Sequence, residues 1–201
     1  MVMKVIGMDT SYKYLNICLL DGDVVVDSLH MECFKQQSEW MIPKMKELMD
    51  RHGWASEDIE AMVITEGPGS YTGIRIAMTV AKVFCSSMNI PLYTLSTLQL
   101  YASNREHTAV LMDARGKRAY IGKYHLGKAV MEDTVLPIEE LSNVLTEDDF
   151  IVGDGSLVGK EDAFEDVAGH FLALRPEWKK VENVNLLVPK YLKDTKEYLV
   201  K

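Results

Sequence analysis

The chain has 201 residues, 47% of them hydrophobic, which is typical of a globular protein with one ordinary domain or two small ones. Its net charge of −8, without a cluster of lysines and arginines, argues against a protein that grips nucleic-acid phosphates by itself. No apolar run is long enough for a membrane span or a signal peptide, and the three cysteines lie in or beside apolar segments. We therefore expect a cytoplasmic protein with free, buried thiols.

The hydrophobic periodicity predicts strands that alternate with helices, the order of an α/β protein with mixed sheets and helices on their faces. Strands are expected at residues 3–9, 14–20, 23–31, 60–65, 91–95, 108–113, 118–125, 128–135 and 149–153. Helices are expected near residues 37–51, 74–88, 97–104, 138–145 and 160–174.

One strand–turn–strand–turn–strand pattern occurs twice in the chain. The first copy has an apolar strand that ends at Asp9, and the second has one that ends at Asp113. Because hairpins have similar sequences, the alternative is that the two copies resemble each other by chance. The aspartate at the end of the first strand in both copies favours a duplication. The pattern predicts two lobes, residues 1–104 and a shortened second lobe of residues 105–201.

A glycine-rich loop separates the strand expected at residues 60–65 from the following helix. It reads Gly67, Pro68, Gly69, Ser70, Tyr71, Thr72, Gly73, Ile74, Arg75. It is not a P-loop, because Gly73 is followed by Ile74 and Arg75 instead of Lys and Ser or Thr, and its spacing does not match G-x-G-x-x-G. Three roles stay open for it: a tight turn, a contact with a protein partner, and a phosphate contact through backbone N–H groups.

Candidates for catalysis are few. No two of the five histidines are four residues apart, and none has cysteine or acidic neighbours at metal-ligand spacing, so we expect no metal site. Asp9, Thr10 and Ser11 are weak candidates for a phosphate loop, but a role of Asp9 in capping its own turn is favoured. The same applies to Asp113, for which we expect Arg115 as an ion-pair neighbour. We expect no catalytic residue and no cofactor.

Apolar stripes on the first two expected helices indicate a surface for a partner. The candidate interface residues are Met41, Met45, Leu48, Met49, Ile76, Val80 and Val83. The second helix is apolar nearly all round, so it needs cover on two sides. The alternative is that both stripes belong to the internal core. Methionine is frequent, 12 in 201 residues, and its adaptable side chain suits surfaces that repack against partners, which favours the interface.

Together, four motifs resemble the bacterial TsaB family, also called YeaZ, over nearly the whole chain. They are residues 6–11, the loop at 67–75, residues 113–115, and Tyr191, Leu192 and Lys193. The resemblance implies the duplicated, ribonuclease-H-like fold of the actin, Hsp70 and sugar-kinase superfamily. It also implies a non-catalytic subunit of the machinery that makes threonylcarbamoyladenosine beside the anticodon of tRNA.

The resemblance further implies partners. The first two helices would bind the catalytic subunit TsaD, or a second copy of this chain, and the ATPase TsaE would join through the complex. ATP or ADP and a metal would belong to these partner subunits, which would also make most contacts with tRNA. This chain would have no cofactor of its own and no contact with a membrane.

Three residues depart from the family pattern. Tyr71 stands where many relatives have Phe, Gln37 where His is common, and Lys193 where Arg often follows Tyr-Leu. Lysine cannot form the two parallel bonds of a guanidinium, so a carboxylate contact at residue 193 would be weaker. The alternative function is a small ATP-dependent kinase or ATPase, which would need the turns after Asp9 and Asp113 to bind phosphates.

Overall fold

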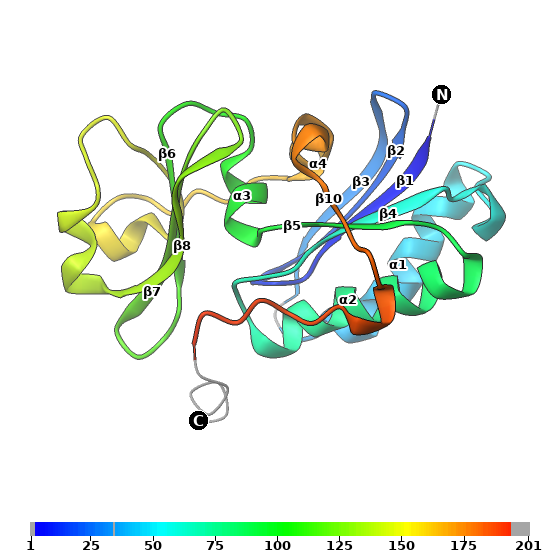
Figure 1. Ribbon diagram of the computed structural model, residues 1–201, viewed down its shortest axis with the longest axis horizontal. Helices are drawn as coiled ribbons and strands as arrows, with labels where there is room; N and C mark the ends of the chain where they lie inside the picture. The colour runs from blue at the N-terminus through cyan, green and yellow to red at the C-terminus, as the bar shows by residue number, and fades with distance from the viewer. Residues whose placement is uncertain (1–2, 34, 194–201) are drawn as a thin grey trace.

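The computed structural model describes residues 3–33 and 35–193, which form two lobes, each built on one sheet (Figure 1). The larger sheet has the order β10-β5-β4-β1-β2-β3 and the smaller β8-β7-β6-β9. The strands of the larger sheet are β1 (Lys4–Asp9), β2 (Tyr14–Asp21), β3 (Val24–Glu32), β4 (Ala61–Thr65), β5 (Leu92–Leu95) and β10 (Lys179–Lys180). Those of the smaller sheet are β6 (Thr108–Asp113), β7 (Arg118–His125), β8 (Lys128–Pro137) and β9 (Phe150–Gly153). The helices are α1 (Gln37–Arg51), α2 (Tyr71–Met88), α3 (Thr97–Ala102) and α4 (Ala168–Ala173).

Both sheets repeat one topology. In the larger sheet β1 pairs antiparallel with β2, which pairs with β3, while β4 lies parallel to β1 on its other side. In the smaller sheet β6 pairs antiparallel with β7, which pairs with β8, while β9 lies parallel to β6. The predicted α/β fold of duplicated, ribonuclease-H-like lobes with a shortened second lobe is therefore confirmed.

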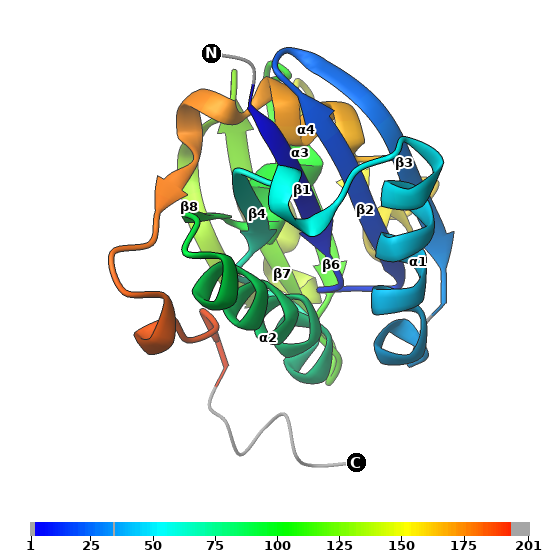
Figure 2. The same cartoon turned by 90° about the vertical axis from the view of Figure 1, so that its right-hand side faces the viewer.

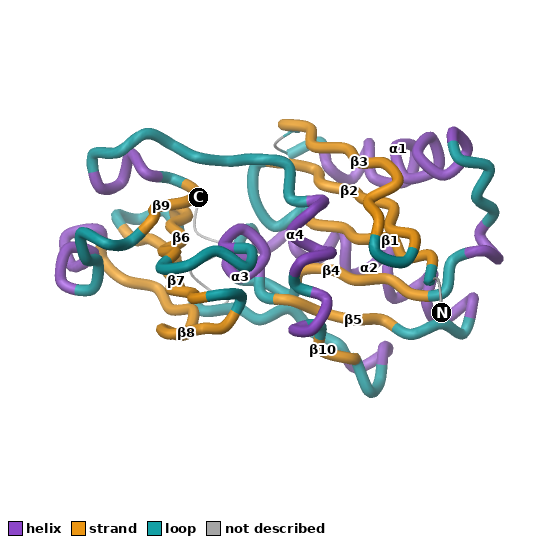
Figure 3. The backbone as a smooth tube through the Cα atoms, turned by 90° about the horizontal axis from the view of Figure 1, so that it is seen from above, coloured by secondary structure: helices purple, strands orange, loops and turns teal. Residues whose placement is uncertain are grey.

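The central strands β1, β2 and β4 of the larger sheet are buried on both faces because helices cover both. Successive side chains of a strand point to opposite faces, so Ile6 and Met8 pack with α1 and α2. Val5 lies on the other face, in a core shared with Tyr101 of α3, Phe171 of α4 and residues of the smaller sheet. Figure 2 shows α1 and α2 side by side on one face of the larger sheet. Figure 3 shows α3 between the strands of the two lobes.

Two expected helices differ from the structure. Residues 138–143 form 3-10 turns instead of a helix over 138–145. The helix expected at 160–174 is shortened to α4, because Ala163 pairs with Gly153 through two backbone hydrogen bonds of 2.8 Å. The backbone N–H of Ala168, the first residue of the shortened helix, donates to the Asp166 carboxylate at 2.9 Å. The sequence also gives no signal for β10, whose two residues are both lysines, as edge strands often have.

The chain returns to the larger lobe after β9. Helix α4 packs on β2 and β3, and β10 extends the larger sheet beside β5. The division at residues 104 and 105 stays a prediction, and residues 194–201 of its second part lie outside the described residues. Within the described part of the chain, no helix has the length and apolar character needed to span a membrane.

Candidate functional site

Asp9 ends β1 with its side chain fully buried. One carboxylate oxygen accepts hydrogen bonds from the backbone N–H and hydroxyl of Ser11 and from the Thr65 hydroxyl at 2.6 Å. The other accepts from Asn16 Nδ2 at 3.0 Å and the Tyr101 hydroxyl at 3.2 Å. Burial and the charge of Asp9 raise the pKa of Tyr101, which keeps this hydroxyl a donor. A carboxylate has roughly four lone-pair positions, and five donors occupy those of Asp9. Asp9 therefore stabilises the surrounding segments and has no free acceptor position for a ligand.

The turn after Asp9 packs directly against the glycine-rich loop. The Thr10 hydroxyl donates to the carbonyl of Gly73 at 2.7 Å, and the backbone N–H of Ser70 donates to the carbonyl of Ser11 at the same distance. A Cβ atom at Gly73 would collide with the carbonyl oxygen of Thr10, and one at Gly69 with that of Ser11. These two glycines are therefore needed for the close approach of two backbone segments of this chain. Of the three roles left open for the loop, the tight turn is the one that accounts for these contacts.

The remaining residues of the loop divide between internal contacts and the surface. The Ser70 hydroxyl accepts from the backbone N–H of Gly73 at 3.2 Å and caps α2. Tyr71 stacks on Tyr191, with 4.9 Å between ring centroids, and the guanidinium of Arg75 donates to the Tyr71 hydroxyl at 3.2 Å. Tyr71, Thr72 and Arg75 thus form the part of the loop that faces outward.

The other two departures from the family pattern have internal contacts. Gln37 is buried, and its side-chain amide donates to the carbonyl of Tyr12 at 2.9 Å. The Lys193 ammonium donates to the carbonyl of Ala114 at 2.6 Å. A single carbonyl needs only one donor, which an ammonium supplies without the paired donors of a guanidinium.

The second turn has no buried carboxylate at the corresponding place. Asp113 is exposed, and its carboxylate accepts from the backbone N–H of Arg115 at 2.7 Å. Asp154, directly after β9, accepts from the backbone N–H of Asp113 and is buried. The sequence pattern does not single out Asp154, although an aspartate at the end of a strand is the signal that marks Asp9 and Asp113. Among the residues the structure describes, no group of three or more His, Cys, Asp or Glu side chains is arranged to hold a metal ion.

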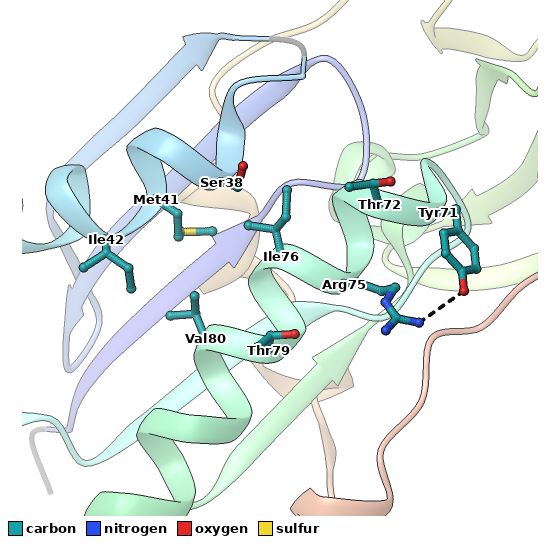
Figure 4. A pocket seen from close by; sticks show the side chains of 9 residues that line it. All are labelled: Ser38, Met41, Ile42, Tyr71, Thr72, Arg75, Ile76, Thr79 and Val80. Carbon is teal, nitrogen blue, oxygen red and sulfur yellow. Dashed lines mark hydrogen bonds between the residues drawn. The ribbon is translucent and has the colours of Figure 1, made fainter. Parts of the chain in front are cut away.

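Helices α1 and α2 border a groove of about 370 Å³ (Figure 4). Its apolar part is formed by Ile42 from α1 and by Ile76 and Val80 from α2, whereas Tyr71 and Arg75 lie near the start of α2. The groove has hydroxyl groups and one cation at its border and apolar side chains inside it. Such a surface suits an apolar helix face of another protein.

The predicted interface residues separate into two groups. Met41, Met45, Leu48 and Met49 are buried against the larger sheet in the core of this chain, and Met41 also lines the groove, so their role in an interface stays a prediction. On α2, Ile76 and Val80 are half-buried and Val83 is 64% exposed. The outward apolar side chains of α1 are Trp40 and Ile42, which is 50% exposed. Helical spacing locates a stripe on α1 correctly but does not say that the sheet covers it.

Comparisons with known proteins agree with this architecture. The family model described as "TsaD: tRNA N6-adenosine threonylcarbamoyltransferase" matches residues 31–148. The tRNA threonylcarbamoyladenosine biosynthesis protein TsaB of Bacillus subtilis (strain 168) is 30% identical over 218 aligned residues, which cover 95% of this chain and 94% of that protein. The protein of the same name from Buchnera aphidicola subsp. Schizaphis graminum is 24% identical, with 91% and 83% covered.

A solved structure supports the fold. YeaZ from Pseudomonas aeruginosa superposes with a TM-score of 0.79 at 24% identity, over 94% of this chain and 100% of that one. At this identity the likeness concerns the fold alone, whereas the match to the Bacillus subtilis protein extends over almost the full length of both sequences. The chain therefore belongs to the TsaB family, also called YeaZ.

Proposed function

We propose that this chain is a non-catalytic subunit in tRNA threonylcarbamoyladenosine biosynthesis, which binds TsaD and supports its transfer of threonylcarbamoyl to tRNA. The observation that carries the proposal is the open apolar surface that α1 and α2 present beside their groove. In this proposal TsaE joins through the complex in the cytoplasm. The partner subunits supply ATP or ADP and a metal, and they make most contacts with tRNA.

The apolar surface is suited to a stable contact. Ile42, Ile76 and Val80 line the groove, and Val83 continues the apolar surface along α2. All four lie on long helices that are fixed to the sheet by buried side chains, so binding orders little of the backbone. Covering such side chains contributes about 25 cal/mol per Å² of apolar surface. The same surface could bind a second copy of this chain, which is the competing occupant in the experiment below.

The first turn and the glycine loop support a role without catalysis of its own. The Asp9 carboxylate accepts hydrogen bonds from internal donors at all its acceptor positions, and the Thr10 hydroxyl donates to the carbonyl of Gly73 in the glycine loop. The Ser70 hydroxyl caps α2 by accepting from the backbone N–H of Gly73, and this contact supplies no base that could take its proton. The alternative kinase or ATPase would need these same groups for phosphate, so the packing of the first turn argues against it.

The experiment is co-purification with TsaD from the same organism, using Val83→Glu. A carboxylate placed in an apolar contact is costly to bury, so we expect the affinity for TsaD to fall at least about tenfold. The matched control is Val130→Glu on β8 of the other lobe, where the native valine is 65% exposed. Both variants should keep the unfolding transition of the native protein, and the control should bind as the native protein does.

A tRNA modification assay with each subunit omitted completes the test. The proposal requires that modification depends on this chain and that Val83→Glu lowers it while Val130→Glu does not. Equal binding by both variants would exclude the α2 surface as the interface. If the native chain binds itself but not TsaD, and Val83→Glu abolishes this self-association, the surface belongs to a homodimer. ATP hydrolysis by the isolated chain, without a complex, would favour the kinase or ATPase alternative.

A further inference from the structure

Asp154 is the meeting point of the two hairpin turns. Its side chain lies between the turn after β1 and the turn after β6, and the residue is only 3% exposed. One carboxylate oxygen accepts from the Lys13 ammonium at 2.8 Å. The other accepts from the Tyr12 hydroxyl and from the backbone N–H of Asp113 at 2.7 Å. Donors from both lobes therefore converge on one buried anion.

Each donor is held in its donating state. The Lys13 ammonium lies 5.1 Å from the ring centroids of both Tyr12 and Phe164. Burial by itself would lower the pKa of Lys13. The hydrogen bond to Asp154 and the charge of that carboxylate outweigh the effect of burial, so the pKa of Lys13 is raised. Burial, followed by the hydrogen bond to Asp154, raises the pKa of Tyr12. An ammonium, a neutral hydroxyl and a backbone N–H that point at one place are a typical set of donors for a carboxylate or a phosphate.

The sequence separations show what the contact joins. Asp154 lies 142 residues from Tyr12 and 141 from Lys13, but only 41 from Asp113. The carboxylate thus extends from the smaller lobe and engages the tip of the first turn of the larger lobe. Loss of the contact between Asp154 and the first turn would leave the Lys13 cation without its buried partner and would remove a direct polar link between the lobes.

We propose that the two turns form an anion-binding site between the lobes, and that this site is occupied by the chain's own Asp154, which locks the lobes together. The site accepts a carboxylate or a phosphate by its chemistry, but the internal carboxylate excludes an external one. This inference is independent of TsaD binding, since none of its residues lies on the outward surface of α1 and α2.

Chemical rescue tests the occupied site. In the full-length chain, Asp154→Ala removes the carboxylate and leaves room for formate, the smallest carboxylate. We expect the melting temperature to fall by about 5 °C or more and to recover by at least half in formate, compared with chloride at equal ionic strength. The matched control is Asp162→Ala, which removes a nearby exposed carboxylate bound to the Ser156 N–H. Neither the control nor the native protein should respond to formate beyond the effect of chloride.

The double variant Lys13→Met with Asp154→Ala identifies the site of rescue. Without the cation, formate should no longer raise the melting temperature. An equal response to formate in Asp154→Ala and in Asp162→Ala would overturn the proposal, as would a native melting temperature in Asp154→Ala.

A second measurement applies even if Asp154→Ala does not fold. Titration of the native protein with inorganic phosphate should give no saturable binding, because the internal carboxylate occupies the donors. Saturable binding of phosphate to the native protein that is lost in Lys13→Met would show an open site and would contradict the lock.

Discussion

The two hairpin turns have the same pattern in the sequence and opposite roles in the structure. Asp9 is fully buried and accepts five hydrogen bonds, whereas Asp113 is exposed and its carboxylate accepts one from Arg115. The first turn lies under the glycine loop, and the Tyr101 side chain of α3 also reaches Asp9. A repeated pattern therefore specifies a repeated backbone, but the neighbouring segments decide what its aspartate does.

The parallel strand beside each turn shows where the difference arises. In the larger lobe β4 ends at Thr65, whose hydroxyl donates to Asp9. In the smaller lobe β9 is followed by Asp154, whose carboxylate cannot donate to Asp113 and instead accepts from Lys13 and Tyr12 of the other turn. Thr65 thus completes a hydrogen-bond network within the larger lobe, whereas Asp154 links the two lobes.

The largest difference between the turns should appear when each aspartate is removed. Asp9→Ala leaves several buried donors without an acceptor, so we expect it to lower the free energy of unfolding by more than about 3 kcal/mol. Asp113→Ala removes one exposed hydrogen bond and should cost less than about 1 kcal/mol. Urea unfolding of both variants measures the two losses, and losses of similar size would contradict the different roles of the turns.

The glycines beside each turn sharpen the comparison. Gly73→Ala pushes a Cβ into the carbonyl oxygen of Thr10, so we expect a loss of about 2–3 kcal/mol from the shift it forces. Gly116 in the second turn has a φ of +63°, and a Cβ atom added there would meet no other atom within 4 Å. Gly116→Ala should therefore cost only about 1–2 kcal/mol of backbone strain. Urea unfolding tests both, and a larger loss for Gly116→Ala would reverse the comparison.

The smallest effect concerns alkaline pH and only the first turn, since the second has no tyrosine between Asp113 and Arg118. The unfolded chain releases the Tyr12 proton near pH 10, while the folded chain keeps it because burial and Asp154 raise the pKa. The unfolded state then binds fewer protons, so this residue lowers stability as pH rises above about 10, by up to about 1.4 kcal/mol per pH unit.

Tyr12→Phe should therefore make the alkaline loss of stability shallower. Unfolding in urea at several values between pH 8 and 11 measures the slopes of the native protein and the variant. Arg115→Ala is the control in the second turn, because arginine keeps its charge over this range. Identical slopes for the native protein and Tyr12→Phe would be the contrary result.

Most of the element order is predictable because hydrophobic period is a local property. The strand ends at Asp9 and Asp113, the helix over residues 37–51 and the duplication agree with the structure. The helix expected at 160–174 is shorter because Ala163 pairs with a distant strand residue, Gly153, which no local pattern encodes. The two residues of β10 pair with β5 at the edge of the sheet, a contact that depends on the return of the chain to the larger lobe.

The sequence by itself determined the family, the duplicated α/β order and the glycine loop, since these depend on neighbouring residues and on motifs. Tertiary structure alone decided which apolar stripes are covered: the sheet buries Met41 and Met45, while Val83 stays exposed. It also decided that Asp9 is saturated with donors and that Asp154 joins the turns. These roles depend on groups that are far apart in the chain and meet only when the lobes pack, so burial and hydrogen bonding decide them and residue type does not.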